Sequence, residues 1–193
     1  MITFVGNQSE GFYISNGSKS RWQNCPSELA THLRSVNTSQ VRGLAGGPGG
    51  KYWLRTSQGT YTNGTASGIP TSDIRIYAFG GKGDWFSKSS AGGTKWGSVD
   101  QTLRDKIDEV GSRNIKTLSI GTNGSWAMTW GNNRWSWHGC PSRLGDKLRA
   151  ASSVENIVLS PFNSDHWWVE YGNGNSDFWL PKSWKDDLDH VRH

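Results

Sequence analysis

Internal repetition constrains the fold of this chain more than any other feature of its sequence. Three segments share one order of features: an aromatic run, a turn with Gly or Asn, a second aromatic segment, Cys or Leu before Pro, and spaced leucines. These segments are GFYISNGSKSRWQNCPSELATHLRSV, SWAMTWGNNRWSWHGCPSRLGDKLRAASSV and HWWVEYGNGNSDFWLPKSWKDDLDHV. The chain is therefore built from copies of one structural unit.

Two weaker copies bring the number of units to five. DWFSKSSAGGTKWGSVDQTLRDKIDEV keeps the layout with fewer aromatic residues, and KYWLRTSQGTYTNG supplies the front half of a further copy. A chain of 193 residues is long enough to bury a core without metals or disulfides, so we expect a single repeat domain. Its units span about 2–40, 41–75, 76–114, 115–156 and 157–193.

The front half of each unit has the pattern of a three-stranded meander. A short apolar run is followed by a turn, an aromatic run, a second turn and another aromatic segment. Short apolar and aromatic runs bounded by Gly, Asn or Pro are typical of strands, and short turns between them predict antiparallel hairpins. Second turns of this kind lie at Asn16-Gly17, Gln58-Gly59, Asn132-Asn133 and Asn173-Gly174.

The back half of four units has the spacing of a short helix. One apolar stripe recurs every three to four residues, as in an amphipathic helix. The stripes are Cys25, Leu29, Leu33, Val36; Val99, Leu103, Ile107, Val110; Cys140, Leu144, Leu148; and Leu180, Trp184, Leu188, Val191. The second unit differs, because NGTASGIPTSDIRI has no such stripe, and we expect no helix there.

Five equivalent sheets joined by crossovers predict a closed five-bladed β-propeller, mainly β, with three-stranded blades and inter-blade helices. A linear solenoid is the alternative. An open stack would need atypical polar units at its ends, whereas the last unit here has the ordinary pattern. We therefore favour the ring.

Composition limits the environment and the partners of the chain. Hydrophobic residues make up 33%, but 12 Trp and 25 Gly allow a core built from a few large rings. The net charge of +5 is spread without a basic block, and no apolar stretch is long enough for a membrane span. The start MITFVGNQSE lacks the regions of a signal peptide, so we expect a cytoplasmic protein, or one released without a conventional signal peptide.

The layout of aromatic-x-aromatic, Gly, Trp, Cys or Leu, Pro-x-x-Leu resembles tandem repeats of poorly characterised fungal proteins and, more loosely, small propeller lectins. The resemblance covers the whole chain, but its motif is structural. It implies sugar binding as a class of function, and no individual site residue is carried over from it.

The five copies can be compared with one another to separate scaffold positions from candidate contact positions. In the second strand the first residue is always aromatic and the third is mostly apolar, which predicts core positions. The intervening positions vary, and variation there marks candidate ligand contacts. From these and neighbouring positions we select Trp53, Arg55, Trp130, His138, Trp168 and Glu170 as candidate ligand-binding residues.

The same residues have a structural interpretation that stays open, because aromatic side chains at the varied positions could pack against the neighbouring blade. Cys25 and Cys140 belong to non-adjacent blades and are expected to be buried, reduced thiols. The five His have no metal-ligand spacing. We therefore expect no metal and no cofactor, and no catalytic residue can be assigned.

The function favoured by these features is that of a lectin. Sugars present C–H faces that suit Trp rings and hydroxyl groups that suit Arg, Glu and Asn, and repeated grooves would bind clustered glycans or glycoproteins with avidity. An RNA partner is the alternative, with a basic toxin of the ribosome-inactivating type as its enzymatic form. A glycoside hydrolase is a further option, with Asp84, Asp165, Glu170 and Asp177 as candidate carboxylates. Binding is favoured over catalysis, and an interaction scaffold also stays open.

Overall fold

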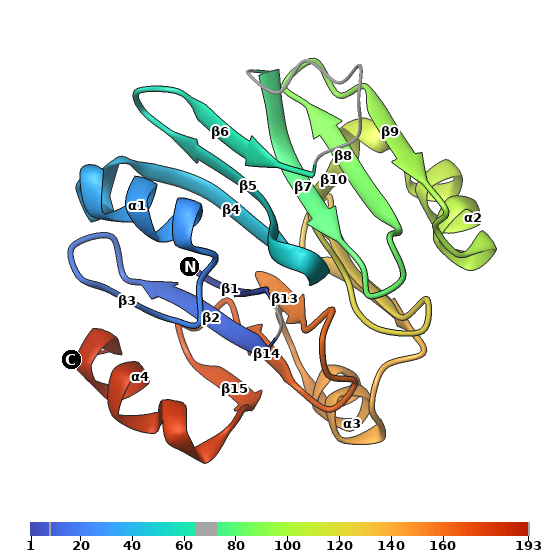
Figure 1. The fold of residues 1–193 in the computed structure, drawn as a ribbon. Helices are drawn as coiled ribbons and strands as arrows, with labels where there is room; N and C mark the ends of the chain where they lie inside the picture. Colours follow the sequence, from blue (N-terminus) through green and yellow to red (C-terminus); the bar gives the residue numbers. More distant parts are fainter. Residues whose placement is uncertain (8, 65–72, 193) are drawn as a thin grey trace.

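The computed structural model describes residues 1–7, 9–64 and 73–192, and within them it forms five three-stranded antiparallel sheets (Figure 1). Each sheet is a meander in which the middle strand pairs with both neighbours. We number the sheets 1 to 5 along the chain. Sheet 1 contains β1 (Ile2–Gly6), β2 (Glu10–Ser15) and β3 (Ser20–Gln23), and sheet 2 contains β4 (Val41–Gly47), β5 (Lys51–Thr56) and β6 (Thr60–Asn63). Sheet 3 contains β7 (Ile74–Phe79), β8 (Trp85–Ser89) and β9 (Thr94–Gly97), sheet 4 contains β10 (Ile115–Ile120), β11 (Trp126–Trp130) and β12 (Arg134–His138), and sheet 5 contains β13 (Asn156–Leu159), β14 (Trp167–Glu170) and β15 (Ser176–Trp179). The expectation of a mainly β chain with short helices in five three-stranded units is confirmed.

Short helices follow four of the sheets, where the apolar stripes predict them. They are α1 (Ser27–Ser35), α2 (Gln101–Val110), α3 (Ser142–Ala150) and α4 (Lys185–Arg192), with 3₁₀ turns at Thr38–Gln40, Pro48–Gly50, Ser112–Asn114 and Lys182–Trp184. The stripe residues are the buried face of each helix, as Leu103, Ile107 and Val110 are in α2. The expectation that the second unit lacks a helix concerns residues 65–72, which lie outside the described residues.

Each helix packs between the sheet that it follows and the next sheet. The apolar cluster around α1 joins sheets 1 and 2, that around α2 joins sheets 3 and 4, and that around α3 joins sheets 4 and 5. The cluster that contains Trp184, Leu188 and Val191 joins sheet 5 to sheet 1, so Figure 1 shows α4 beside the first sheet. A further cluster around Trp53 and Tyr77 lies between sheets 2 and 3.

The first strands of the five sheets contact one another in cyclic order. β1 contacts β4, β4 contacts β7, β7 contacts β10, β10 contacts β13, and β13 contacts β1. These strands line one cavity of about 210 Å³. The molecule therefore has a central space bounded by one strand of every unit. Across the described residues, no helix is long and apolar enough to cross a membrane.

Contacts between sheet 1 and the helical segment that follows sheet 5 join residues far apart in the sequence. The Asn16 Nδ2 donates to the Val191 carbonyl oxygen at 2.7 Å, and the Gln23 Nε2 donates to the Asp187 carboxylate at 2.6 Å. The Trp184 ring lies 4.6 Å from the Phe12 ring, centre to centre. Polar and aromatic contacts therefore fix α4 on the first sheet.

The two cysteines occupy equivalent places, each directly before the Pro that precedes a helix. Both are free thiols, and burial raises the pKa of each to about 12. The Cys25 Sγ lies 3.9 Å from the Phe12 carbonyl oxygen, and the Cys140 Sγ lies 3.5 Å from the Trp126 carbonyl oxygen. The reactive thiolate is therefore scarce at neutral pH.

We expect both thiols to react slowly with a disulfide reagent in the native protein and rapidly once the chain is unfolded in denaturant. The raised pKa keeps the sulfur protonated, and the partial burial of both side chains limits access of the reagent. A colorimetric thiol assay with and without denaturant measures the two rates. Rapid stoichiometric reaction of the native protein at neutral pH would contradict the prediction.

Candidate functional site

The candidate binding positions lie in the gaps between consecutive sheets. In each middle strand the core residues of one face pack against the preceding sheet, and the alternate residues face the following sheet. The positions that differ among the units are those that face the following sheet. The first of these positions on each middle strand, which we call the inner row, is occupied by Tyr13, Trp53, Phe86, Ala127 and Trp168. The position two residues further along the strand, which we call the outer row, is occupied by Ser15, Arg55, Lys88, Thr129 and Glu170.

The inner row is buried. Trp53 is 2% exposed, and its ring stacks on Tyr77 of the next sheet at 6.2 Å. Trp168 is 5% exposed, and its ring stacks on Phe178 at 5.1 Å. The structure thus places both candidate tryptophans against neighbouring side chains, so that neither offers an open ring face to a ligand.

Two side chains of the outer row bond across the gap to the next unit. The Lys88 Nζ donates to the carbonyl oxygens of Arg113 at 3.0 Å and Ile115 at 2.5 Å. The Thr129 hydroxyl lies 3.4 Å from the Glu155 carbonyl oxygen, to which it donates. Lys88 and Thr129 therefore link successive sheets, which explains their presence without a ligand.

Glu170 differs, because its carboxylate has no bond to the following sheet among the described residues. It accepts a hydrogen bond from Asn156 of its own sheet at 3.5 Å and otherwise faces a groove between sheets 5 and 1. The groove has a volume of about 400 Å³. Its lining includes Glu155, Glu170, Trp168, Asn16, Ser176 and Ile14. We call it the 5/1 groove.

The 5/1 groove combines acceptor groups with an apolar wall. Glu155 and Glu170 form no ion pair within the part of the chain that the structure describes. Ile2, Ile14 and Val191 supply buried apolar side chains to the lining. Carboxylates without a cationic partner are strong acceptors for hydroxyl groups of a ligand.

Arg55 occupies the outer-row position between sheets 2 and 3. Its Nη2 donates to the Arg42 carbonyl oxygen at 3.2 Å, and its guanidinium lies 6.0 Å from the centre of the Trp53 ring. Burial lowers the pKa of Arg55, and the charges of Arg75 and Arg42 lower it further. The structure thus brings the candidates Trp53 and Arg55 together, apart from the 5/1 groove.

Trp130 and His138 lie at opposite ends of the pair formed by β11 and β12, so they share no site with each other. Trp130 is partly buried, with the Lys106 Nζ 5.5 Å from its ring centre. His138 is exposed and stacks on Trp126 at 6.3 Å. The six candidate residues therefore divide among four places, of which only two contain a pair.

The candidate carboxylates of a hydrolase do not converge. Asp177 pairs with the Lys147 Nζ at 2.9 Å and accepts the Tyr171 hydroxyl, and Lys147 holds the pKa of Asp177 below its usual range. Asp84 is buried and accepts from the Lys82 backbone N–H, and Asp165 is exposed on the turn before β14. Glu170 is joined instead by Glu155, which the sequence comparison did not select.

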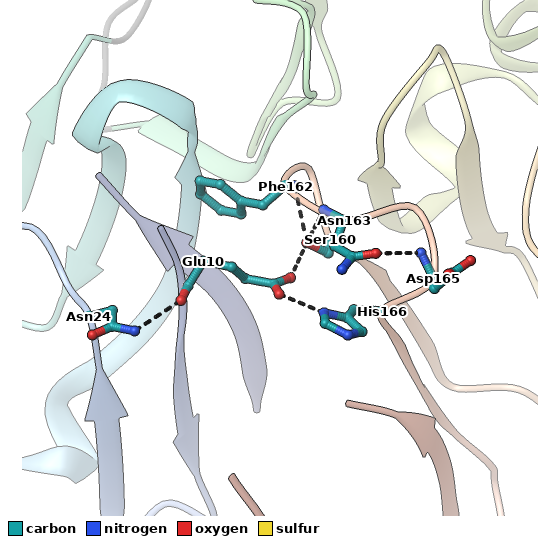
Figure 2. Close-up of polar contacts among 7 residues, drawn as sticks. All are labelled: Glu10, Asn24, Ser160, Phe162, Asn163, Asp165 and His166. Atoms are coloured by element: carbon teal, nitrogen blue, oxygen red, sulfur yellow. Dashed lines mark hydrogen bonds and ion pairs between the residues drawn. The ribbon is translucent and has the colours of Figure 1, made fainter. Parts of the chain in front are cut away.

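A serine, a histidine and a glutamate also meet between sheets 5 and 1, at the ends opposite the 5/1 groove (Figure 2). The His166 Nδ1 lies 2.5 Å from the Glu10 Oε2, and the Ser160 hydroxyl donates to the Glu10 Oε1. Ser160 is buried and its oxygen also accepts the backbone N–H groups of Phe162 and Asn163. The Ser160 hydroxyl bonds to the carboxylate and not to the imidazole, so this is not a nucleophile beside its base. The three side chains instead join sheet 1 to sheet 5, and we call them the clamp.

Comparisons with known proteins assign no function to these sites. No protein-family model matches the sequence, and no curated protein matches it. Among solved structures, selenomethionine-substituted virginiamycin B lyase from Staphylococcus aureus is similar over 93% of this chain and 69% of that chain, with 9% identity and a TM-score of 0.33. A similarity at that TM-score does not establish a shared fold.

Proposed function

We propose that the five sheets close into a five-bladed β-propeller. The cyclic contacts of the first strands and the packing of α4 between sheets 5 and 1 support this proposal. In such a ring the residues at equivalent inter-sheet positions are held at fixed distances from one another. Grooves of different chemistry can then coexist on one rigid scaffold.

We propose that the protein binds carbohydrate, and that the 5/1 groove is its binding site. The observation that carries this proposal is the meeting of two carboxylates that lack ion pairs, Glu155 and Glu170, in a groove of about 400 Å³. Sugar hydroxyls donate to carboxylates, and the apolar wall suits the C–H groups of a sugar ring. The hydroxyl of Ser15 adds a polar group to the lining, whereas the Asn16 amide is engaged by Val191 and by the turn at Ser18 and Lys19.

The 5/1 groove favours a neutral glycan over RNA, because its two carboxylates outnumber the Met1 ammonium, which also lines it and donates to the Ser15 carbonyl oxygen. Two carboxylates repel the phosphates of a nucleic acid, which proteins ordinarily bind with Lys and Arg. A glycoside hydrolase is the second candidate function, because that chemistry requires two carboxylates on either side of one bond. Glu155 and Glu170 would be its acid and base or nucleophile.

We expect Glu170→Gln to weaken glycan binding about tenfold or more, because a charge-assisted hydrogen bond is replaced by a neutral one. A glycan array on the unmodified protein identifies the sugar, and titration calorimetry on the variant then gives the change in affinity. Glu28→Gln is the matched control: Glu28 is exposed on α1, which packs between sheets 1 and 2, and it does not belong to the lining of the groove, so its replacement should leave the affinity unchanged.

Three further results bear on the proposal. Equal affinity of the Glu170→Gln variant and the unmodified protein for every sugar bound would show that the site lies elsewhere. Cleavage of the bound glycan, seen by mass spectrometry and lost in both Glu155→Gln and Glu170→Gln, would establish the hydrolase. Damage to ribosomal RNA in a cell-free translation assay, without glycan binding, would replace the proposal by the RNA-directed function.

A further inference from the structure

Arg42, Arg75 and Lys116 occupy the same structural position in three successive sheets. Each lies where the register of the first strand shifts: between Val41 and Gly43, between Ile74 and Ile76, and between Ile115 and Thr117. The extra residue of such a bulge is left out of the strand pairing, so its side chain is free to project from the sheet. All three cations are exposed.

Arg55 adds a fourth cation between the first two. Its outer-row position faces sheet 3, whose first strand carries Arg75. Arg75 and Arg42 are close enough to Arg55 for their charges to depress its pKa, after the larger effect of burial. The Arg55 Nη2 also donates to the Arg42 carbonyl oxygen at 3.2 Å, and β4 contacts β7, so the three arginines belong to one region at the start of these two strands.

Within the described parts of the chain, none of the four cations forms an ion pair with an acidic side chain. Asp73, two residues before Arg75, is bonded to the Ser90 hydroxyl, and the sequence of residues 65–72, TASGIPTS, contains no Asp or Glu. The Arg55 Nε is enclosed and has no hydrogen-bond partner among the described residues.

Two of the four cations, Arg75 and Lys116, line the cavity that the first strands bound, and Arg42 and Arg55 lie outside its lining. Thr117 and Asn156 line the same cavity, but the Thr117 hydroxyl bonds to the Thr129 hydroxyl and the Asn156 amide donates to Glu170, so the two cations are its available donors. Its volume of about 210 Å³ accommodates a tetrahedral oxyanion with several waters. Like charges that folding brings together without a counterion create a region of positive potential, which is a binding site for an anion.

We propose that Arg75 and Lys116, at the edge of the central cavity, form with the neighbouring Arg42 and Arg55 a binding site for a phosphate or sulfate group. Guanidinium groups match the geometry of these oxyanions with paired N–H donors, and several of them together favour a doubly charged group over chloride or a single carboxylate. The site lies between sheets 2 and 3 and continues toward sheet 4, whereas the 5/1 groove lies between sheets 5 and 1. It is independent of the carbohydrate proposal.

The test is a titration of the intact chain with sodium phosphate and sodium sulfate in a chloride buffer, followed by calorimetry and by the melting temperature. Sodium chloride at equal ionic strength controls for screening of the cluster. We expect either oxyanion to raise the melting temperature more than chloride does.

Arg55→Gln and Arg75→Gln should each weaken oxyanion binding at least tenfold. Arg34→Gln is the matched control, because it removes the same charge from an exposed place on α1 and should leave binding unchanged. In chloride buffer without either oxyanion, the melting temperature of the Arg75→Gln variant should be no lower than that of the unmodified protein, because the substitution removes repulsion among like charges.

Two results would overturn the proposal. One is an equal rise of the melting temperature with chloride and with both oxyanions, which would show screening without a site. The other is an equal loss of binding in Arg34→Gln and Arg55→Gln, which would show attraction by net charge alone. Failure of glycan binding at the 5/1 groove would leave these measurements unaffected.

Discussion

Deletion of residues 181–193 is expected to abolish the cooperative unfolding transition of the whole chain. The deletion removes Trp184, Leu188 and Val191, which are at most 3% exposed and pack on the first sheet. Burial of each such side chain contributes about 1.5–3 kcal/mol, and the exposed surface of sheet 1 adds to the loss. The total is comparable with the whole stability of a domain, about 5–15 kcal/mol.

Thermal unfolding followed by circular dichroism measures this effect. Asp189→Ala is the matched control, because Asp189 lies on the exposed side of α4 and its replacement leaves the packing intact. If the shortened chain kept its transition within a few degrees of the full chain, the closed propeller would be wrong, since α4 would then be dispensable to the first sheet.

Trp126→Ala is expected to lower the free energy of unfolding by about 3–5 kcal/mol, the usual cost of removing a buried Trp. Trp126 is 3% exposed and packs in the cluster that joins sheets 3 and 4 through α2. Its indole N–H also donates to the Thr102 hydroxyl at 2.9 Å, so the substitution removes a hydrogen bond together with the packing. Denaturant titration gives the free energy.

His138→Ala provides the comparison for Trp126→Ala. His138 stacks on the same indole from the exposed side, so its removal opens no internal cavity. Surface substitutions of this kind usually change stability by less than about 0.5 kcal/mol. Equal effects of the two substitutions would mean that position 126 is not part of the core.

The sequence predicts the local structure of this chain well because each unit carries its own signals. Alternation along the middle strand predicts buried Phe12 and Ile14, and the stripe of Leu103 and Ile107 predicts the buried face of α2. Both patterns depend on residues close together in the chain. Five copies of the same pattern then make the repeat architecture visible in one sequence.

The composition of the grooves could not be predicted in the same way. Trp53 and Trp168 occupy a position whose residue differs among the five units, as expected for a ligand contact. Their rings nevertheless pack on Tyr77 of the neighbouring sheet and on Phe178 of the neighbouring strand. Glu155 joins Glu170 only because the first strand of sheet 5 borders the same groove. The clamp of Glu10 and Ser160 joins residues 150 positions apart, and no local pattern connects them.

The contacts of α4 with sheet 1, which we call the seam between sheets 5 and 1, also affect the order in which the molecule folds. Each meander closes loops of a few residues, whereas the bonds from Asn16 to Val191 and from Gln23 to Asp187 close loops of 175 and 164 residues. Closing a long loop costs more chain entropy than closing a short one, and this cost comes before the contacts at its ends stabilise the chain. We therefore expect the local sheets to form first and the seam to form last. In the proposed closed propeller, we therefore expect these late-forming contacts to be the first that break when the native molecule unfolds.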